Sequence, residues 1–219
     1  MPVYHRSRLI HIHIPKTGGT AIENVFHSMG DMVWGKESWV GAEHLHQRWY
    51  ELQHLSIFEL YSFTGEFRNF HSFAVIRNPY SRLVSEFHWR RSPHRQKVAP
   101  LWSFDSLEDL VWAIPLEIDT QWRDCVNSAS KKQTNFLVHV RPQHHYVCTT
   151  AGLQAVKELL RFERLKEDFN GLLGRYGLYT DRIRTPPEKK FAEYFNREIL
   201  DRVNVLYAKD FSLGGYEML

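Results

Sequence analysis

The sequence predicts an α/β fold, in which a parallel sheet is flanked by helices on both faces and the whole chain forms a single domain. Three observations predict it. Short apolar runs typical of buried strands alternate with helical patterns along the chain. A glycine-bearing loop at residues 15–20 joins the first of these runs directly to a helical pattern. A second apolar run, at residues 73–76, passes at once into a helix that starts with Pro79.

The first half of the chain carries the clearest strand and helix patterns. Isoleucines at alternate positions within residues 9–14 fall on one face of an extended segment. Leu83, Val84 and Phe87 have helical spacing and give the segment behind the second apolar run an apolar face. These patterns predict strands at residues 9–14 and 71–76, and helices at residues 20–29, 45–55, 56–61 and 79–90.

In the second half of the chain, helix caps and prolines that interrupt regular structure predict the helices and strands. Residues 92–100 are polar, contain proline and predict a loop. Ser106 is a suitable N-cap for the helical pattern that follows it. The Thr-Pro-Pro sequence at residues 185–187 interrupts the chain. These signals predict helices at residues 106–113, 165–176, 188–195 and 197–209, an extended segment at 136–140 and a strand at 159–162.

The loop between the first strand and the first helix has the layout of a phosphate-binding loop. Two glycines let the backbone approach an anion closely, and the N–H groups and dipole of the following helix favour negative charge there. A lysine adds a mobile positive charge, and two threonines add hydroxyl donors. The spacing of a Walker A loop is absent. The predicted phosphate-binding residues are Pro15, Lys16, Thr17, Gly18, Gly19 and Thr20.

A second anion-binding arrangement is predicted around the next strand. Arg77 stands at the carboxyl end of the apolar run 73–76, which is where open α/β sheets bind their ligands. Ser85 lies about two turns into the helix behind it. A guanidinium at the strand end and this hydroxyl are therefore expected to converge on one phosphate group.

The two motifs resemble those of sulfotransferases that use 3′-phosphoadenosine 5′-phosphosulfate (PAPS). Residues 15–20 are similar to the 5′-phosphosulfate loop of Golgi carbohydrate sulfotransferases and their soluble bacterial relatives, and residues 77–85 resemble the motif whose Arg and Ser bind the 3′-phosphate. Further similar blocks, including Arg-Pro-Gln at residues 141–143 and others at 162–169 and 206–216, spread the resemblance over nearly all of residues 8–217. The resemblance implies a P-loop-type fold, PAPS as the sulfuryl donor, PAP as its product and an acceptor hydroxyl, most readily on a glycan.

Sulfuryl transfer sets two further requirements. A cation must stabilise the negative charge that develops on the oxygen of the departing nucleotide, and Lys16 is the candidate. A base must take the acceptor proton, and histidine has a suitable pKa. His44 is the candidate because the resembled family often has a histidine at the start of this predicted helix; His46 and Glu43 are the alternatives. The histidines of the first strand are expected to be structural.

The composition suits a globular protein with an anionic ligand. The net charge of +3 is mildly basic and lacks the strong positive balance of nucleic-acid-binding proteins, so nucleic acid is not an expected partner. Cys125 and Cys148 are expected to be free thiols, although one bridge stays open in an oxidising compartment, and no metal site is expected. The chain shows neither a membrane-spanning run nor a signal-peptide core, which favours a cytoplasmic protein, with a trimmed lumenal domain as the alternative.

Two other functions remain open at this stage. One is a nucleotide kinase or other phosphotransferase, which the missing Walker A spacing disfavours. The other is a protein that binds nucleotide or RNA without catalysis. The basic cluster at residues 88–97 suits an anionic acceptor, and the one at residues 182–190 suits a loop that closes over the cofactor. Such basic runs are usually solvated surface. The acceptor and the oligomeric state are left open.

Overall fold

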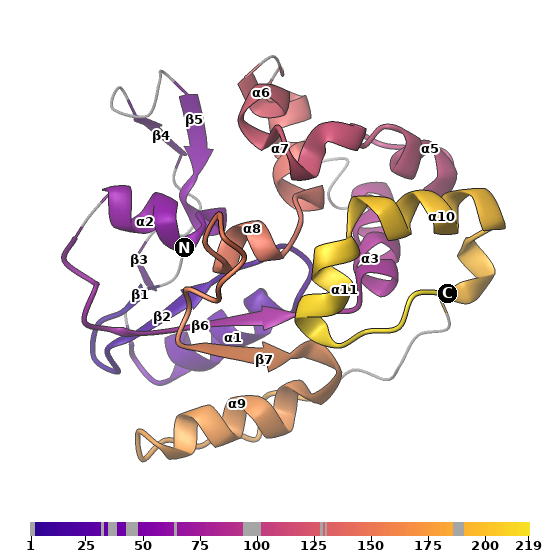
Figure 1. The fold of residues 1–219 in the computed structure, drawn as a ribbon. Helices are drawn as coiled ribbons and strands as arrows, with labels where there is room; N and C mark the ends of the chain where they lie inside the picture. Colours follow the sequence, from indigo (N-terminus) through magenta and orange to yellow (C-terminus); the bar gives the residue numbers. More distant parts are fainter. Residues whose placement is uncertain are drawn as a thin grey trace. The chain divides into compact units, whose positions relative to one another are not determined.

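The computed structural model describes residues 3–31, 33–34, 39–42, 48–63, 65–93, 102–127, 129, 131–185 and 191–219 (Figure 1). The strands are β1 (Val3–Tyr4), β2 (Leu9–Ile12), β3 (Val33–Trp34), β4 (Trp39–Ala42), β5 (Arg48–Glu51), β6 (His71–Ile76) and β7 (Glu158–Arg161). The α-helices are α1 (Gly19–Ser28), α2 (Ile57–Phe63), α3 (Pro79–Arg91), α5 (Leu107–Trp112), α6 (Trp122–Asn127), α7 (Lys131–Val140), α8 (His144–Val147), α9 (Leu165–Gly174), α10 (Arg197–Leu206) and α11 (Ala208–Gly214). Short 3-10 helices are η2 (Leu52–His54), η3 (Leu116–Asp119), η4 (Phe162–Arg164) and η5 (Ala192–Tyr194).

The chain forms two compact units. The first comprises Met1–Ile76 with His145–Pro187, and the second comprises Arg77–His144 with Glu188–Leu219. The first unit contains a five-stranded sheet in the order β3-β1-β2-β6-β7. Its β2, β6 and β7 are parallel, whereas β1 pairs antiparallel with both β2 and β3. The predicted α/β class, with a parallel sheet at its centre, is confirmed.

Helices cover both faces of this sheet. On one face, alternate strand residues such as Phe73 and Val75 pack against α1 and α9 in one hydrophobic cluster. Phe26 of α1 meets Phe169 of α9 edge to face, with ring centroids 5.8 Å apart. Figure 1 shows α2 and α8 on the opposite side of the sheet. Burial on both faces explains why β6 is apolar without interruption from residue 73 to residue 76.

The second unit is helical among its described residues. Side chains from α3, α5, α7, α10 and α11 form its hydrophobic core. Charged groups are buried beside it: the Glu86 carboxylate forms an ion pair with the Arg90 guanidinium at 2.6 Å and contacts His139 Nδ1 at 2.9 Å. Buried charges are tolerated when they are paired, and here Arg90 pairs with Glu86 within α3 while His139 joins the same carboxylate to α7.

Most of the predicted elements are confirmed, but two were wrong. Residues 136–140 end helix α7, because Phe136, Leu137 and Val140 have helical spacing and enter the core of the second unit. The described part of the predicted helix 45–55 is strand β5, which pairs with β4, followed by the 3-10 helix η2. The helix predicted at 197–209 is divided into α10 and α11 at Tyr207. The predicted loop 92–100 and helix 188–195 lie partly outside the described residues.

Candidate functional site

The segment between β2 and α1 has a backbone that turns sharply at two positions. Lys16 has φ 69° and Gly18 has φ 90°, so left-handed residues alternate with ordinary ones. Alternation of this kind turns successive N–H groups towards a common concavity, which is the geometry of anion-binding nests. Left-handed geometry at a lysine costs about 1–2 kcal/mol, and strain of this kind is concentrated at binding sites. The predicted phosphate-binding loop therefore has a backbone suited to that function.

The two threonines of this loop differ in their surroundings. The Thr17 hydroxyl is fully buried and donates to the carbonyl oxygen of Ile14 at 2.8 Å, which closes the turn on itself. Thr20 is exposed in the first turn of α1. In this conformation the Thr17 hydroxyl is engaged within the loop, whereas Thr20 is open to solvent.

Close packing requires both glycines of the loop. A β-carbon at Gly19 would lie 2.0 Å from Nε2 of His13, and one at Gly18 would lie 3.1 Å from Leu165 and Phe162. His13 is held in turn, because its Nδ1 lies 2.9 Å from the carboxylate of Glu23 on α1. The loop is thus packed between a strand histidine and the side chains that follow β7.

Replacing Gly19 by alanine is expected to destabilise the protein by about 1–3 kcal/mol, because the added methyl group must displace His13 or the loop. The same change is expected to weaken binding of PAP through the distorted loop. Gly171→Ala is the matched control, since a β-carbon there meets nothing within 4 Å and alanine is the better helix former. Urea unfolding and PAP titration of both variants test this, and equal behaviour of the two would contradict it.

His11 in β2 and His13 just after it are both buried, but only His13 has polar partners. His13 contacts Glu23, and its carbonyl oxygen accepts from Nδ1 of His54 at 2.8 Å. His11 is fully buried, stacks on Phe73 with centroids 4.9 Å apart, and has no hydrogen-bond partner for either ring nitrogen. Burial, and after it the charge of His13, lowers the pKa of His11 well below its usual value.

Replacing His11 by phenylalanine is expected to make stability less sensitive to acid. Folded His11 stays neutral, whereas in the unfolded chain it takes up a proton below about pH 6.5. As the pH falls through that value, the folded state therefore loses up to about 1.4 kcal/mol per pH unit relative to the unfolded state. The free energy of unfolding, measured by urea titration from about pH 7.5 to about pH 5, should fall less steeply in His11→Phe than in the native chain. Identical slopes would exclude His11 as the source.

The second predicted motif begins on the neighbouring strand. Because β2 and β6 are adjacent and parallel, with Ile12 opposite Ala74, both strands end at the same edge of the sheet. Arg77 follows β6 directly and is 7% exposed. Asn78 then caps α3 by accepting from the backbone N–H groups of residues 80 and 81. These signals explain why the strand ends at residue 76 and the helix begins at once.

The side chain of Arg77 runs along the first turn of α3. Its Nε donates to the hydroxyl oxygen of Ser81 at 3.1 Å. Ser85 is half-buried one turn further along the same helix. The pairing of Arg77 with Ser85 on one phosphate remains a prediction.

Two residues for which the sequence predicted no role hold the backbone of Arg77 in place. The side-chain amide of Gln143 accepts from the backbone N–H of Arg77 at 2.9 Å and donates to its carbonyl oxygen at 2.8 Å. Asp210 accepts from the backbone N–H of Gln143 at 2.7 Å. The sequence carried a signal for both, because each lies in a block that resembles the sulfotransferases, but spacing alone did not give their function.

Several predicted residues lie outside the described part of the chain. The candidate base His44 and its alternatives His46 and Glu43 are among them, as are residues 186–190 of the basic segment 182–190. Their roles remain predictions from the sequence.

A family model described as "Sulfotransferase family" matches residues 2–217. No curated protein matches the chain. Within the described residues no helix combines the length and apolar character needed to cross a membrane, and Cys125 and Cys148 are not joined in a disulfide.

Proposed function

Because this chain belongs to the sulfotransferase family, we propose that it transfers a sulfuryl group from PAPS to an acceptor hydroxyl on a carbohydrate. One observation carries the proposal. Two neighbouring parallel strands end at the same sheet edge, and a left-handed, glycine-bearing loop follows one while a buried arginine follows the other. Ligands of open α/β sheets bind at this edge.

The two motifs are proposed to bind opposite ends of the PAPS molecule. Residues 15–20 are proposed to hold the 5′-phosphosulfate through backbone N–H groups, the Lys16 ammonium and the Thr20 hydroxyl. Arg77 and Ser85 are proposed to hold the 3′-phosphate, for which a guanidinium offers two parallel donors. The donor carries negative charge at both ends, and both sets of residues offer positive charge or N–H and O–H donors.

The reaction is an in-line displacement at sulfur. The acceptor oxygen forms a bond to sulfur while the bond from sulfur to the bridging phosphate oxygen breaks, and that oxygen keeps the electron pair and leaves as PAP. Lys16 is proposed to stabilise the charge that grows on the leaving oxygen, and His44 to take the acceptor proton. Positioning and charge stabilisation account for most of the catalysis in related phosphoryl transfers.

Thermal unfolding with separate additions of PAP, PAPS, ATP and an RNA oligomer tests the donor. A ligand at 100 times its Kd stabilises the folded state by about 2.7 kcal/mol, so the melting temperature should rise with PAP and PAPS. Stabilisation by ATP alone would favour a phosphotransferase, and stabilisation by RNA alone a nucleic-acid-binding protein. Incubation with ³⁵S-labelled PAPS and a panel of glycans, small alcohols, phenols and tyrosine peptides then tests the carbohydrate acceptor.

Replacing Arg77 by alanine is expected to weaken PAP binding by roughly tenfold or more, since a charge-assisted hydrogen bond contributes about 1.5–3 kcal/mol. Ser85→Ala should weaken it less. Arg197→Ala is the matched control, because it removes the same charge from the exposed surface of α10. Isothermal titration with PAP measures all three. Unchanged PAP affinity in both Arg77→Ala and Ser85→Ala would remove the 3′-phosphate assignment.

A further inference from the structure

The backbone of Arg77 is held by the side chain of Gln143 through two hydrogen bonds, which we call the bracket. Gln143 is 1% exposed, and its amide satisfies both main-chain groups of Arg77, as acceptor through Oε1 at 2.9 Å and as donor through Nε2 at 2.8 Å. An uncharged amide is the side-chain group that does both at once, because it has a carbonyl oxygen and an NH₂ group side by side. The bracket fixes the peptide groups on either side of Arg77, from which its side chain starts.

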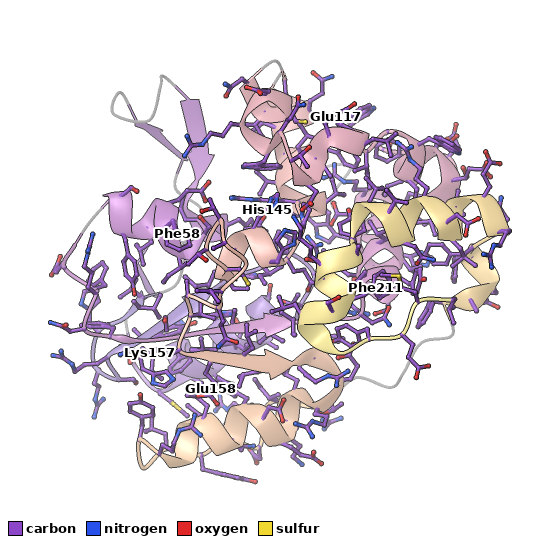
Figure 2. The ribbon with its side chains drawn as sticks, viewed as in Figure 1. Phe58, Glu117, His145, Lys157, Glu158 and Phe211 are labelled. Atoms are coloured by element: carbon purple, nitrogen blue, oxygen red, sulfur yellow. The ribbon has the colours of Figure 1, made fainter. Side chains whose placement is uncertain are left out.

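The bracket is itself held by a buried carboxylate. Asp210 is 1% exposed and accepts from the backbone N–H of Gln143 at 2.7 Å, the backbone N–H of His144 at 2.9 Å and Nδ1 of His144 at 2.8 Å. It lies on α11, next to Phe211, which Figure 2 labels. A buried carboxylate is tolerated when several donors bond to it, and here two of the donors belong to the turn that carries Gln143.

A third contact joins the same two segments. Arg82 is 2% exposed, and its guanidinium donates to the carbonyl oxygens of His139 and Arg141, each at 2.8 Å. These bonds join the first turns of α3 to residues 139–141, just before Gln143 in the chain. Together with the two bonds from Gln143 to Arg77, they hold the segment that carries Gln143 against the N-terminal end of α3.

We infer that Gln143 is a positioning residue for nucleotide recognition: it fixes the backbone of Arg77 so that the guanidinium meets the 3′-phosphate, and Asp210 holds Gln143 in place. This inference rests on the proposed function. Arginine has a long side chain, so a small displacement of its backbone moves the guanidinium out of bidentate geometry. An error of about 1 Å in such placement costs up to about 10²-fold.

Discrimination between PAP and 5′-AMP tests the inference, because 5′-AMP lacks the 3′-phosphate. Titration calorimetry gives the affinity ratio of PAP to AMP for the native chain, Gln143→Met, Arg77→Ala and the double variant. Gln143→Met keeps the side-chain length and removes both hydrogen bonds. We expect this ratio to fall by about tenfold in Gln143→Met, with AMP affinity nearly unchanged. In the Arg77→Ala background the same change should have little further effect, which is the signature of a coupled pair.

Controls separate positioning from general loss of stability. Asn196→Ala removes an N-cap of α10 in the same unit and is expected to cost about 1 kcal/mol without changing the ratio. If Gln143→Met does not fold, Gln143→Glu is used instead, since it keeps the acceptor for the Arg77 N–H and loses the donor to the Arg77 carbonyl; a smaller fall in the ratio is then expected.

The outcomes distinguish the two levels of the proposal. Equal loss of PAP and AMP affinity in a folded Gln143 variant, no loss of either, or a full effect that persists without Arg77 would each overturn the positioning role alone. A native chain that binds PAP no better than AMP overturns the 3′-phosphate site of the proposed function, and the inference fails with it.

Discussion

Replacing Lys16 by alanine is expected to lower kcat by about 10²–10³-fold while the affinity for PAPS falls much less. The reason is that charge on the bridging oxygen grows only as the bond to sulfur breaks, so the ammonium contributes mainly in the transition state. Lys16 has φ 69°, and alanine at this position bears a similar backbone strain, so the comparison isolates the side chain. Steady-state kinetics and PAPS titration together measure the difference between kcat and binding.

Two further variants at the same position sharpen this test. Lys16→Met keeps much of the side-chain length without the charge and should resemble Lys16→Ala. Lys16→Gly relieves the left-handed strain and should be at least as stable as the native chain, yet equally slow. Loss of PAPS binding with turnover preserved at saturation would reduce Lys16 to an anchor for the donor.

Replacing His44 by alanine is expected to lower turnover by about 10²–10⁴-fold, the usual contribution of a general base. PAP affinity should be preserved, because His44 is proposed to contact the acceptor and not the nucleotide. In the native chain the rate should also fall at acid pH, as the base becomes protonated and can no longer accept the hydroxyl proton. Turnover against pH and PAP titration measure both expectations.

His46→Ala is the control for this assignment. Near-native turnover in His44→Ala with a collapse in His46→Ala would assign the base to His46. Near-native turnover in both would move the test to Glu43→Gln. The acid limb of the pH profile identifies a titrating base, and the three variants identify which residue it is.

Local signals predicted the elements that surround the proposed donor site. β6 followed from a short apolar run, α1 from the glycines before it and α3 from Pro79, each of which acts within a few residues of the element it specifies. The helical spacing of Phe136, Leu137 and Val140 was present in the sequence as well, but a short apolar run of this length also fits a strand. Burial in the core of the second unit decides for the helix, and burial is not a local property.

In the candidate site, too, the residues that act locally were predicted and those that act through long-range contacts were not. The loop residues and Arg77 were identified from residue types and spacing, because anion binding demands glycines, N–H groups and cations. The bracket of Gln143 and the carboxylate of Asp210 were not assigned a role, since each acts on a residue more than sixty positions away in sequence. Only the structure brings these partners together.

The contact between Gly19 and His13 has a consequence for the order in which the chain is assembled. Two contacts of the loop at residues 13–20 join partners close in sequence: Thr17 bonds three residues back, and His13 pairs with Glu23 in the helix that follows. Its packing against Phe162 and Leu165 depends on residues that are added much later. The bracket on Arg77 closes a segment of 66 residues. Loop-closure entropy rises with the logarithm of length, so this closure costs about 1.7 kcal/mol more than one of about ten residues. A nascent chain can therefore form these two local contacts as soon as β2 and α1 have been added, whereas the backbone of Arg77 acquires its support only after residue 143 has been added and its long-range contacts have formed.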